Sequence, residues 1–323
     1  MVTSQTVPRI NLDSSSPTEL TTALLDCSCA FLTGHGVTDS VRTEMLDVSR
    51  AFFDLPADVK ARVRWPGEGY WRGWQPLVGG RVASAGLEPD VLERFEVPSP
   101  SDVVGLSDGT RLTVDDFDLW PEEPPGFAAA WCRYYAALAA LSARVITAIS
   151  DSLQLPPADL PAWCTHQRGS LVVNNYLAQE LAPPEGEIRQ RAHTDIGGLT
   201  VLWADDAPGG LEVRMPGSST WTPVRFADGD LLIQPGDLLS RWTNNTLRAN
   251  IHRVVNPPAE AASSGRRVSI VYFHYPHLDT VVNPAPSCVT SEHPPRPSIH
   301  AGDYLCKAIH RPEDRYGAAG VDL

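Results

Sequence analysis

In the first half of the chain, apolar residues recur at the three- and four-residue spacing that is typical of amphipathic helices. Leu20 and Leu24, for example, lie on one such stripe. Two shorter runs, each followed by turn-forming residues, have the pattern of strands. The pattern predicts strands over residues 7–13 and 31–37, and helices over residues 18–30, 40–53, 125–153 and a short stretch after Pro56.

From residue 170 onward the pattern changes to short β-rich runs that are separated by turns such as PGG, ADGD, PGD and NNT. Strands of this length and spacing are typical of an antiparallel sandwich or barrel. Residues 299–316 have the pattern of a closing helix. The predicted strands cover residues 170–178, 192–203, 209–215, 220–226, 230–236, 238–243, 249–255 and 266–275.

These elements predict one structural unit, mainly β with flanking α, whose core is a jelly roll. We expect residues 1–165 to form an N-terminal helical and mixed region that packs on the core. Residues 166–298 then form the core, and residues 299–323 form a C-terminal helix and tail. The 29 prolines in 323 residues, roughly 9% against a usual ~5%, fit many short elements joined by turns.

Charge and composition exclude several classes of partner. A formal net charge of −13 repels phosphate backbones, so we expect no nucleic acid. No run approaches the ~18 apolar residues of a membrane span, and the N-terminus has no secretory signal pattern. The six cysteines include no CxxC pair, which favours reduced thiols in a cytoplasmic protein. We expect a small-molecule substrate and a monomer or weak dimer.

The stretch AHTDIGGLTVLW carries the strongest candidate for chemistry. His193 and Asp195 stand two positions apart, so on a strand both would point to the same face. With His252 they would complete the two-histidine, one-carboxylate triad of non-haem Fe(II) sites. An HxD pair alone often arises by chance. The pair gains weight here because His252 lies several hairpins later. In a closed β-architecture the chain can return to the same end of the fold after several hairpins.

A second pair of residues has the chemistry of a carboxylate receptor. Arg267 and Ser269 would share one strand face, and Tyr176 could add a hydroxyl. A guanidinium holds a carboxylate through bidentate, charge-assisted hydrogen bonds. For an isolated arginine, a salt bridge at the end of a strand is the simpler reading.

Residues 67–97 are rich in glycine and aromatic side chains, and they could line a pocket or cover an edge of the core. His35 stands alone between two glycines, so a role in packing or in a turn is favoured over chemistry. The side chains that we predict to line a substrate pocket are Tyr70, Arg72, Trp74, Arg81, Trp203, Trp242 and Phe273.

Several motifs, in order, resemble the isopenicillin N synthase-like family of Fe(II)- and 2-oxoglutarate-dependent oxygenases. The N-terminal part contributes VPRINLD, FLTGHGV, AFFDLPADVK and GYWRGW. The C-terminal part contributes NNY, AHTDIGGLTVL, GDLLSRWTNN, HRVVNP and RVSIVYF. Together they span nearly the whole chain, and such a series is far more specific than any one motif.

The resemblance implies a distorted double-stranded β-helix in which His193, Asp195 and His252 hold Fe(II). It also implies that the distal carboxylate of 2-oxoglutarate is bound by Arg267 and Ser269, with Tyr176 and Asn174 of the NNY motif nearby. The implied reaction consumes O₂, releases succinate and CO₂, and hydroxylates, desaturates or cyclises a small molecule, such as an intermediate of secondary metabolism or antibiotic biosynthesis.

The presence of Asp195 argues against halogenation, because family halogenases lack the ligand carboxylate. Two loops depart from the family pattern: Thr243-Asn244-Asn245 lacks the usual glycine after asparagine, and LAQELAPPEG follows the NNY motif. Two alternatives stay open at this point. One is a family member that uses iron and O₂ without 2-oxoglutarate, and the other is a non-catalytic jelly-roll module that binds a ligand.

Overall fold

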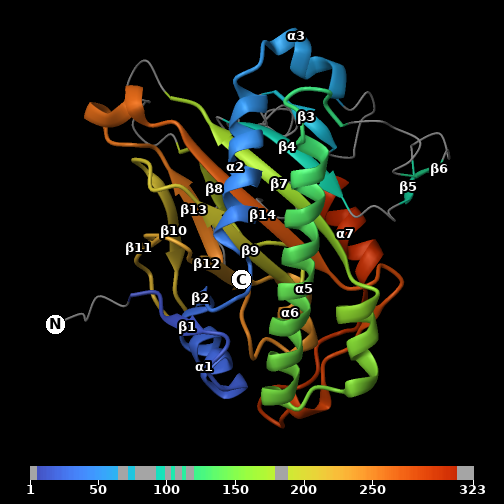
Figure 1. Cartoon of the computed structure of the whole chain (residues 1–323). Helices are drawn as coiled ribbons and strands as arrows, with labels where there is room; N and C mark the ends of the chain where they lie inside the picture. The colour runs from blue at the N-terminus through green and yellow to red at the C-terminus, as the bar shows by residue number, and fades with distance from the viewer. Residues whose placement is uncertain are drawn as a thin grey trace.

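Two β-sheets face each other in the computed structural model of the chain, and helices cover the outer face of the larger sheet (Figure 1). The structure describes residues 6–64, 72–76, 92–98, 103–105, 111–113, 120–178 and 188–310. The helices are α1 (Pro17–Cys27), α2 (Asp39–Phe53), α3 (Ala57–Lys60), α5 (Phe127–Leu153), α6 (Asp237–Trp242) and α7 (Ala301–His310).

The strands of the two main sheets are β1 (Arg9–Asn11), β2 (Ala30–Thr33), β3 (Gly73–Gln75), β4 (Glu93–Pro98), β7 (Arg168–Tyr176), β8 (Gln190–His193), β9 (Leu199–Ala204), β10 (Gly210–Arg214), β11 (Thr222–Pro223), β12 (Leu231–Pro235), β13 (Ile251–Val255) and β14 (Arg267–Tyr275). The larger sheet has the order β1-β2-β12-β9-β14-β7-β4-β3, and the smaller has the order β11-β10-β13-β8. Two small hairpin-like pairs complete the described strands: β5 (Val103–Gly105) with β6 (Arg111–Thr113), and β15 (Val281–Val282) with β16 (Ile299–His300).

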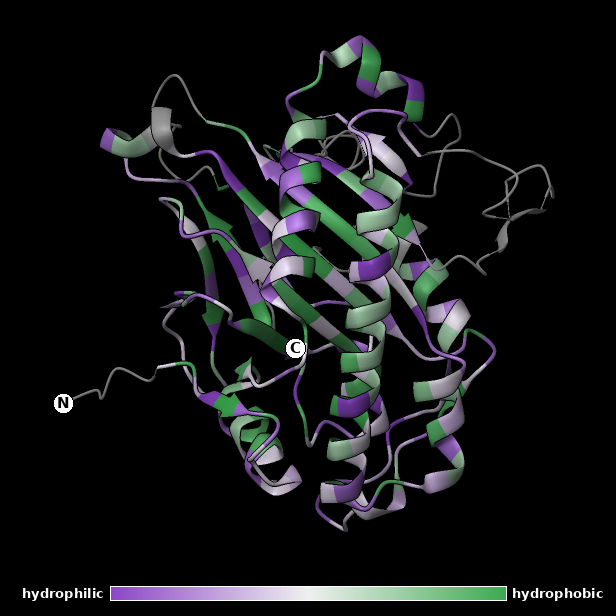
Figure 2. Cartoon of the chain, viewed as in Figure 1, coloured by the Kyte–Doolittle hydropathy of each residue, from purple (hydrophilic) through white to green (hydrophobic). Residues whose placement is uncertain are grey.

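The alternation of side chains along the central strands divides the core into two parts. On β9, Leu199, Val201 and Trp203 pack on the helical side, while Leu202 packs toward the smaller sheet. Successive residues of a strand point to opposite faces, so one strand serves both parts. Figure 2 shows the result, with the strands behind α2 and α5 largely apolar. The space between the two sheets is the inside of a jelly roll, as the sequence predicts.

Helix α5 has 27 residues, and by length and composition alone it could cross a membrane. The same test is passed by core helices, and α5 packs on the larger sheet as one of them. Its buried stripe, which follows the predicted helical period, is formed by Phe127, Ala130, Trp131, Tyr134, Leu138, Leu141, Ser142, Val145, Ile146, Ile149 and Ser150.

The predicted helices agree with α1, α2, α3 and α5 to within a few residues, and the described part of the predicted closing helix forms α7. The predicted strand over residues 238–243 is wrong, because this segment is helix α6. Leu238 and Leu239 are adjacent and both are buried. A strand with one solvated face would bury only one of two neighbours, whereas a short helix in the core can bury both.

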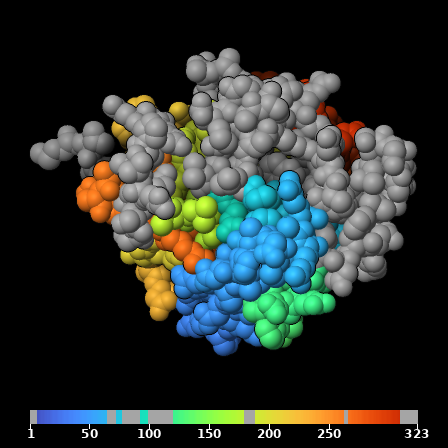
Figure 3. All heavy atoms as spheres, turned by 90° about the horizontal axis from the view of Figure 1, so that it is seen from above, coloured from blue at the N-terminus to red at the C-terminus, as the bar shows by residue number. Residues whose placement is uncertain are grey.

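The N-terminal region contributes strands to the larger sheet as well as helices. Strands β1, β2, β3 and β4 all come from residues before 99, and all four join the larger sheet. Near this end, α2 lies beside the β7–β14 pair, where Arg266 pairs with Asp54 at 2.6 Å and Arg50 with Asp205 at 3.0 Å. Figure 3 shows these segments next to one another, with α2 in blue, β7 in yellow-green and the start of β14 in orange.

The turn after α6 explains one departure from the family pattern. Asn244 and Asn245 adopt the left-handed conformation, with φ of 49° and 64°. Asparagine tolerates this region better than most residues, so no glycine is needed there. The Asn244 amide also donates to the carbonyl oxygens of Cys288 and His293, at 3.2 and 3.1 Å.

The loop between β8 and β9 is held by backbone contacts that leave no room for side chains. The Gly198 N–H donates to the carbonyl of His274 at 2.8 Å, and the Asp237 N–H donates to the carbonyl of Asp195 at 2.8 Å. A Cβ atom added at Gly236 would lie 2.3 Å from the carbonyl oxygen of Gly197. The position of Asp195 therefore depends on close packing between this loop and the start of α6.

We predict that Gly236→Ala lowers the free energy of unfolding by about 1–3 kcal/mol, as overpacking of a tight interior does. Because its φ of −103° suits alanine, the cost comes from the clash and not from the backbone. Urea denaturation measures the change. Gly217→Ala is the comparison without a clash: an added Cβ there has no atom within 4 Å, so at its φ of 72° any cost comes from the backbone alone. Equal Fe(II) affinity in both variants would contradict the proposed support of Asp195.

Candidate metal centre and cosubstrate site

His193 and His252 lie directly opposite each other in the smaller sheet. The register of β13 on β8 pairs the two residues, and their ring centroids are 4.2 Å apart. Side chains at paired positions of antiparallel strands project to the same face. Two imidazoles that are 59 positions apart in sequence are thereby brought together at one end of the jelly roll.

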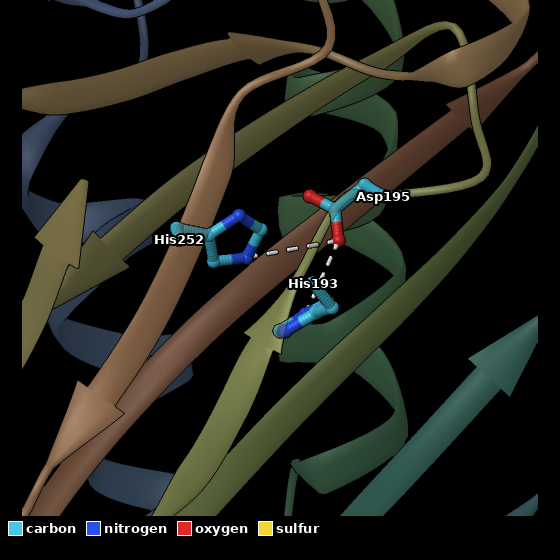
Figure 4. Close-up of side chains that lie close together, drawn as sticks. All are labelled: His193, Asp195 and His252. Carbon is cyan, nitrogen blue, oxygen red and sulfur yellow. Dashed lines mark ion pairs between the residues drawn. The ribbon is translucent and has the colours of Figure 1, made fainter. Parts of the chain in front are cut away.

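Each imidazole is oriented by a backbone carbonyl two residues earlier in its own strand or loop. Nδ1 of His193 lies 2.7 Å from the carbonyl oxygen of Arg191, and Nδ1 of His252 lies 3.3 Å from that of Asn250. A ring that donates from Nδ1 carries its free lone pair on Nε2, which is the tautomer that a metal ligand needs. Both Nε2 atoms face Asp195 (Figure 4).

Asp195 lies in the loop after β8, not on a strand with His193 as the sequence predicts. It nevertheless meets both rings, with its Oδ1 at 3.7 Å from Nε2 of His193 and 3.8 Å from Nε2 of His252. Its other oxygen, Oδ2, accepts a 2.6 Å hydrogen bond from the Thr200 hydroxyl. This bond fixes the carboxylate plane and leaves Oδ1 directed at the imidazoles.

The three ligand atoms fit a metal ion in number, kind and spacing. They lie within 4.8 Å of one another, and the three residues are the metal-binding cluster found among the described residues. Bonds of about 2.0–2.2 Å in an octahedron put adjacent ligand atoms about 3 Å apart, so each ligand atom would have to move by about 1 Å at most. Two imidazoles and one carboxylate on one face of the ion are the donor set of non-haem Fe(II).

The residues predicted to bind a carboxylate lie together on the inner face of the larger sheet. Arg267 pairs with Tyr176, and Ser269 pairs with Asn174, across β14 and β7. All four residues are buried. The guanidinium carbon of Arg267 lies 5.4 Å from the centre of the Tyr176 ring, and the Asn174 amide nitrogen lies 3.4 Å from the Ser269 hydroxyl.

A second buried arginine, which the sequence did not indicate, stands beside this receptor. Arg189 is fully buried, its guanidinium carbon is 5.7 Å from the centre of the same Tyr176 ring, and it donates to the carbonyl oxygens of Leu177 and Gly265. Among the described residues, its Nε and Nη1 atoms have no hydrogen-bond acceptor. Nothing in the local sequence marks it, because Arg189 lies outside the RxS motif.

Two buried guanidinium groups that lie close together favour the binding of an anion. Burial, and then the charge of Arg267, lowers the pKa of Arg189 to about 10, and burial also lowers the pKa of Arg267. Both groups stay protonated at neutral pH. Asp205 is the carboxylate that acts on both, but it also accepts from Arg50 and from the Val268 N–H. A bound carboxylate would supply the missing negative charge.

The predicted pocket residues separate into two groups. Trp74, Trp203 and Trp242 belong to the core on the helical side, and the indole of Trp242 stacks on Trp163 with centroids 4.4 Å apart. The sheet lies between these three side chains and the triad, so they do not line the inside of the jelly roll. Trp203 and Leu199 are four positions apart on β9, so their side chains point to the same face.

Phe273 is the predicted pocket residue that does face inward, where it packs against the core between the sheets. Arg72 is buried directly before β3. Tyr70 and Arg81 lie outside the described residues.

Comparison with known proteins agrees with this geometry. The sequence pattern of the 2OG-Fe(II) oxygenase superfamily matches residues 168–276, and that of the non-haem dioxygenase in morphine synthesis N-terminal domain matches residues 8–123. The chain is 30% identical to the 2-oxoglutarate-dependent dioxygenase caaD of Aspergillus niger, over 86% of this chain and 87% of the relative. The chain belongs to the 2OG-Fe(II) oxygenase superfamily.

Other relatives and structures extend the comparison. Homoarginine-6-hydroxylase 2-ODD-233 of Oryza sativa is 29% identical, over 82% of this chain and 80% of the relative. The crystal structure of a full-length Neurospora crassa protein in complex with alpha-KG has the same fold, with a TM-score of 0.80, 21% identity, and coverage of 96% and 98% of the two chains.

This oxygenase is therefore an enzyme that depends on Fe(II) and 2-oxoglutarate and uses O₂ as a co-substrate. The family prediction, the jelly-roll prediction and the cofactor prediction are confirmed. The alternative of a relative that works without 2-oxoglutarate is not favoured, because the relatives are named as 2-oxoglutarate-dependent enzymes.

We predict that Thr200→Val weakens Fe(II) binding by about 10–100-fold, because hydrogen-bond partners of ligands orient them and tune their basicity. Valine keeps the shape of the side chain and removes only the hydroxyl that donates to Asp195. Calorimetric titration with Mn(II) under nitrogen measures the metal affinity without turnover. Thr22→Val, on the exposed face of α1, is the matched control. Unchanged affinity in Thr200→Val would show that the carboxylate is held by other contacts.

Proposed function

We propose that His193, Asp195 and His252 hold Fe(II) in this dioxygenase, and that Arg267 and Ser269 hold the distal carboxylate of 2-oxoglutarate beside it. The observation that carries the proposal is the convergence of the three ligand atoms within 4.8 Å, in the same jelly roll whose larger sheet carries the buried Arg267 and Ser269. The triad has the chemistry to bind a cation, and the Arg267–Ser269 pair has the chemistry to bind an anion.

Bound Fe(II) and 2-oxoglutarate supply the oxidising chemistry, in which O₂ is consumed, succinate and CO₂ are released, and a substrate is hydroxylated or desaturated. The chain's own residues position these reactants. The two contacts at Nδ1 orient the imidazoles so that Nε2 faces Asp195, and Thr200 holds the carboxylate. Three protein ligands would leave further coordination positions of a bound Fe(II) for the cosubstrate and O₂.

The cosubstrate side of the site is built to bind a dianion. Arg267 offers a planar fork of donors, and the Ser269 hydroxyl lies next to the Asn174 amide. Within the described residues, Asn174 Oδ1 accepts no hydrogen bond, so this amide has capacity for a further partner. We assign Tyr176 the role of separating Arg267 from Arg189, because both guanidinium groups lie over its ring.

We also propose Arg189 as a second cation for 2-oxoglutarate. Its unpartnered donors and its closeness to Arg267 favour a bound carboxylate. It differs from Arg267 in that part of its guanidinium is already fixed by backbone carbonyls, so it adds charge more than direct contacts.

The reaction that we propose is oxygenation or desaturation of a small molecule in secondary metabolism. Asp195 occupies the ligand position that halogenases leave open, which supports oxygenation over halogenation. A relative named as a homoarginine hydroxylase supports the same class. A cytoplasmic location, a monomer or weak dimer, and the absence of nucleic acid and membrane partners stay predictions from the sequence.

We expect Asp195→Ala to abolish Fe(II)-dependent formation of succinate from 2-oxoglutarate. Loss of a direct ligand should reduce activity by more than the ~10–100-fold typical of a lost supporting hydrogen bond. Succinate is measured with and without added Fe(II), and circular dichroism checks the fold. Asp279→Ala, an exposed carboxylate near β15, should retain full activity. Full activity in Asp195→Ala would remove this carboxylate from the metal centre.

The two arginines should differ in their effect on the cosubstrate. Arg267→Met should raise the KM for 2-oxoglutarate by about 100-fold, since it removes charge-assisted hydrogen bonds worth ~1.5–3 kcal/mol each. Arg189→Met should raise it by about 5–10-fold, as loss of one nearby charge does.

Arg248→Met, at an exposed position, serves as the matched control for both. If Arg189→Met leaves the KM unchanged while Arg267→Met raises it, then Arg189 has a structural role only.

A further inference from the structure

A pair of buried carboxamides connects the larger sheet to the segment that leads into β13. Nε2 of Gln234, on β12, donates a 2.6 Å hydrogen bond to Oδ1 of Asn250, and both residues are 1% exposed. The Asn250 N–H donates to the carbonyl oxygen of Pro235 at 3.1 Å. The end of β12 in the larger sheet is thereby joined, by side chain and backbone, to the residue directly before β13 in the smaller sheet.

The Gln234 side chain lies on the inner face of the larger sheet, next to Thr200. Ile233 and Val201 belong to the core on the helical side. Because successive side chains of a strand alternate, their neighbours Gln234 and Thr200 point inward. The register of β12 on β9 pairs these two residues, and the Thr200 hydroxyl donates to Asp195. The contact that fixes Asp195 is therefore one strand away from Gln234.

Asn250 in turn lies against another proposed metal ligand. Its carbonyl oxygen is 3.3 Å from Nδ1 of His252, the second residue of β13. The contacts that hold His252 thus lead back to Gln234, and the contact that holds Asp195 leads back to Thr200. Since Gln234 and Thr200 are paired on neighbouring strands of one sheet, that sheet sets the separation between the two ligands.

The carboxamide pair has a cost for the fold. Oε1 of Gln234 and Nδ2 of Asn250 have no hydrogen-bond partner within the part of the chain that the structure describes. A buried polar atom without a partner destabilises a folded protein, and two apolar side chains of the same shape would avoid this cost. Leu232, the preceding inward residue of β12, is such a side chain. Unpaired buried polar atoms are uncommon, so the pair calls for a role other than stabilising the fold.

We propose that Gln234 and Asn250 are positioning residues of the metal centre, whose mutual hydrogen bond sets the place of His252 relative to Asp195. The inference rests on the proposed function, since it takes these two residues as ligands of Fe(II). Neither carboxamide belongs to the ligand cluster. Gln234 acts through Asn250, and Asn250 acts through its backbone carbonyl on the imidazole. Loss of the hydrogen bond should weaken metal binding although all three ligands remain.

The test measures metal binding and stability separately on the whole protein. Gln234→Met and Asn250→Leu, alone and together, keep the approximate size of each side chain and remove the carboxamide. Calorimetry under nitrogen gives the affinity for Mn(II), and urea denaturation of the metal-free protein gives its stability. The double variant should bind Mn(II) about 5–10-fold more weakly, which is less than the ~10–100-fold typical of a direct partner of a ligand. Its urea midpoint should equal or exceed that of the unchanged protein, because both unpartnered atoms are gone.

The single variants and an exchange variant show whether the two carboxamides act as a unit. Each single variant removes the same hydrogen bond, so each should bind Mn(II) as weakly as the double variant, and the effects on affinity should not add. Gln234→Asn combined with Asn250→Gln keeps both carboxamides and the summed length of the two side chains. This exchange should recover most of the affinity, and it should also restore the EPR spectrum of bound Mn(II), which responds to the geometry of the ligands.

Gln167→Met is the matched control. Nε2 of Gln167 donates a 2.8 Å hydrogen bond to the carbonyl oxygen of Ala139, and its Oε1 likewise has no partner among the described residues. Ala139 belongs to α5, so this carboxamide lies against the helix that covers the larger sheet. The substitution removes the same kind of hydrogen bond at a place without metal ligands, and the affinity for Mn(II) should not change.

The outcomes separate this inference from the proposed function. If the unchanged protein binds Mn(II) and Asp195→Ala does not, but the double variant binds as tightly as the unchanged protein, the inference is wrong and the metal centre stands. A double variant that unfolds at lower urea than the unchanged protein, or a Gln167→Met variant that binds Mn(II) equally weakly, also contradicts it, because the pair would then serve the fold. If the unchanged protein fails to bind Mn(II), or Asp195→Ala binds it as tightly, the proposed function is at fault.

Discussion

The pairing of β8 with β13 is the constraint on which the rest of the site depends. It places His193 opposite His252, and no local feature of either segment could do this. The loop that carries Asp195 is then clamped by backbone hydrogen bonds to β14 and α6, and Thr200 fixes the carboxylate from β9. Metal ligands must be held rigidly, because a site that binds loosely loses both affinity and geometry.

The larger sheet serves two purposes because its side chains alternate. One face of β9 and β14 packs on α2 and α5 through Val201, Trp203 and Ile270, and this apolar contact fixes the sheet. The other face carries Arg267, Ser269 and the polar groups of β4 and β7 into the space between the sheets. The same strands thus provide the packed scaffold on one face and the site residues on the other.

Several charged side chains are buried on the inside of the jelly roll. Two buried arginines lie near the ring of one tyrosine, and β4 carries a further charged pair, Arg94 and Glu96. In a poorly solvated space each group favours a partner of opposite charge. The two arginines fit the distal carboxylate of the cosubstrate that we propose for them.

The sequence by itself predicted most elements of the fold, and it pointed to His193, Asp195 and His252, which converge in the structure, because periodicity and ordered motifs can be recognised from the linear sequence. It failed for residues 238–243, where neighbouring leucines fit strand and helix alike, and for Trp242, whose burial depends on Trp163. Arg189 and Thr200 emerged only from the tertiary structure. Their roles arise from strand register and from which face is enclosed, and both are set by contacts between residues far apart in the chain.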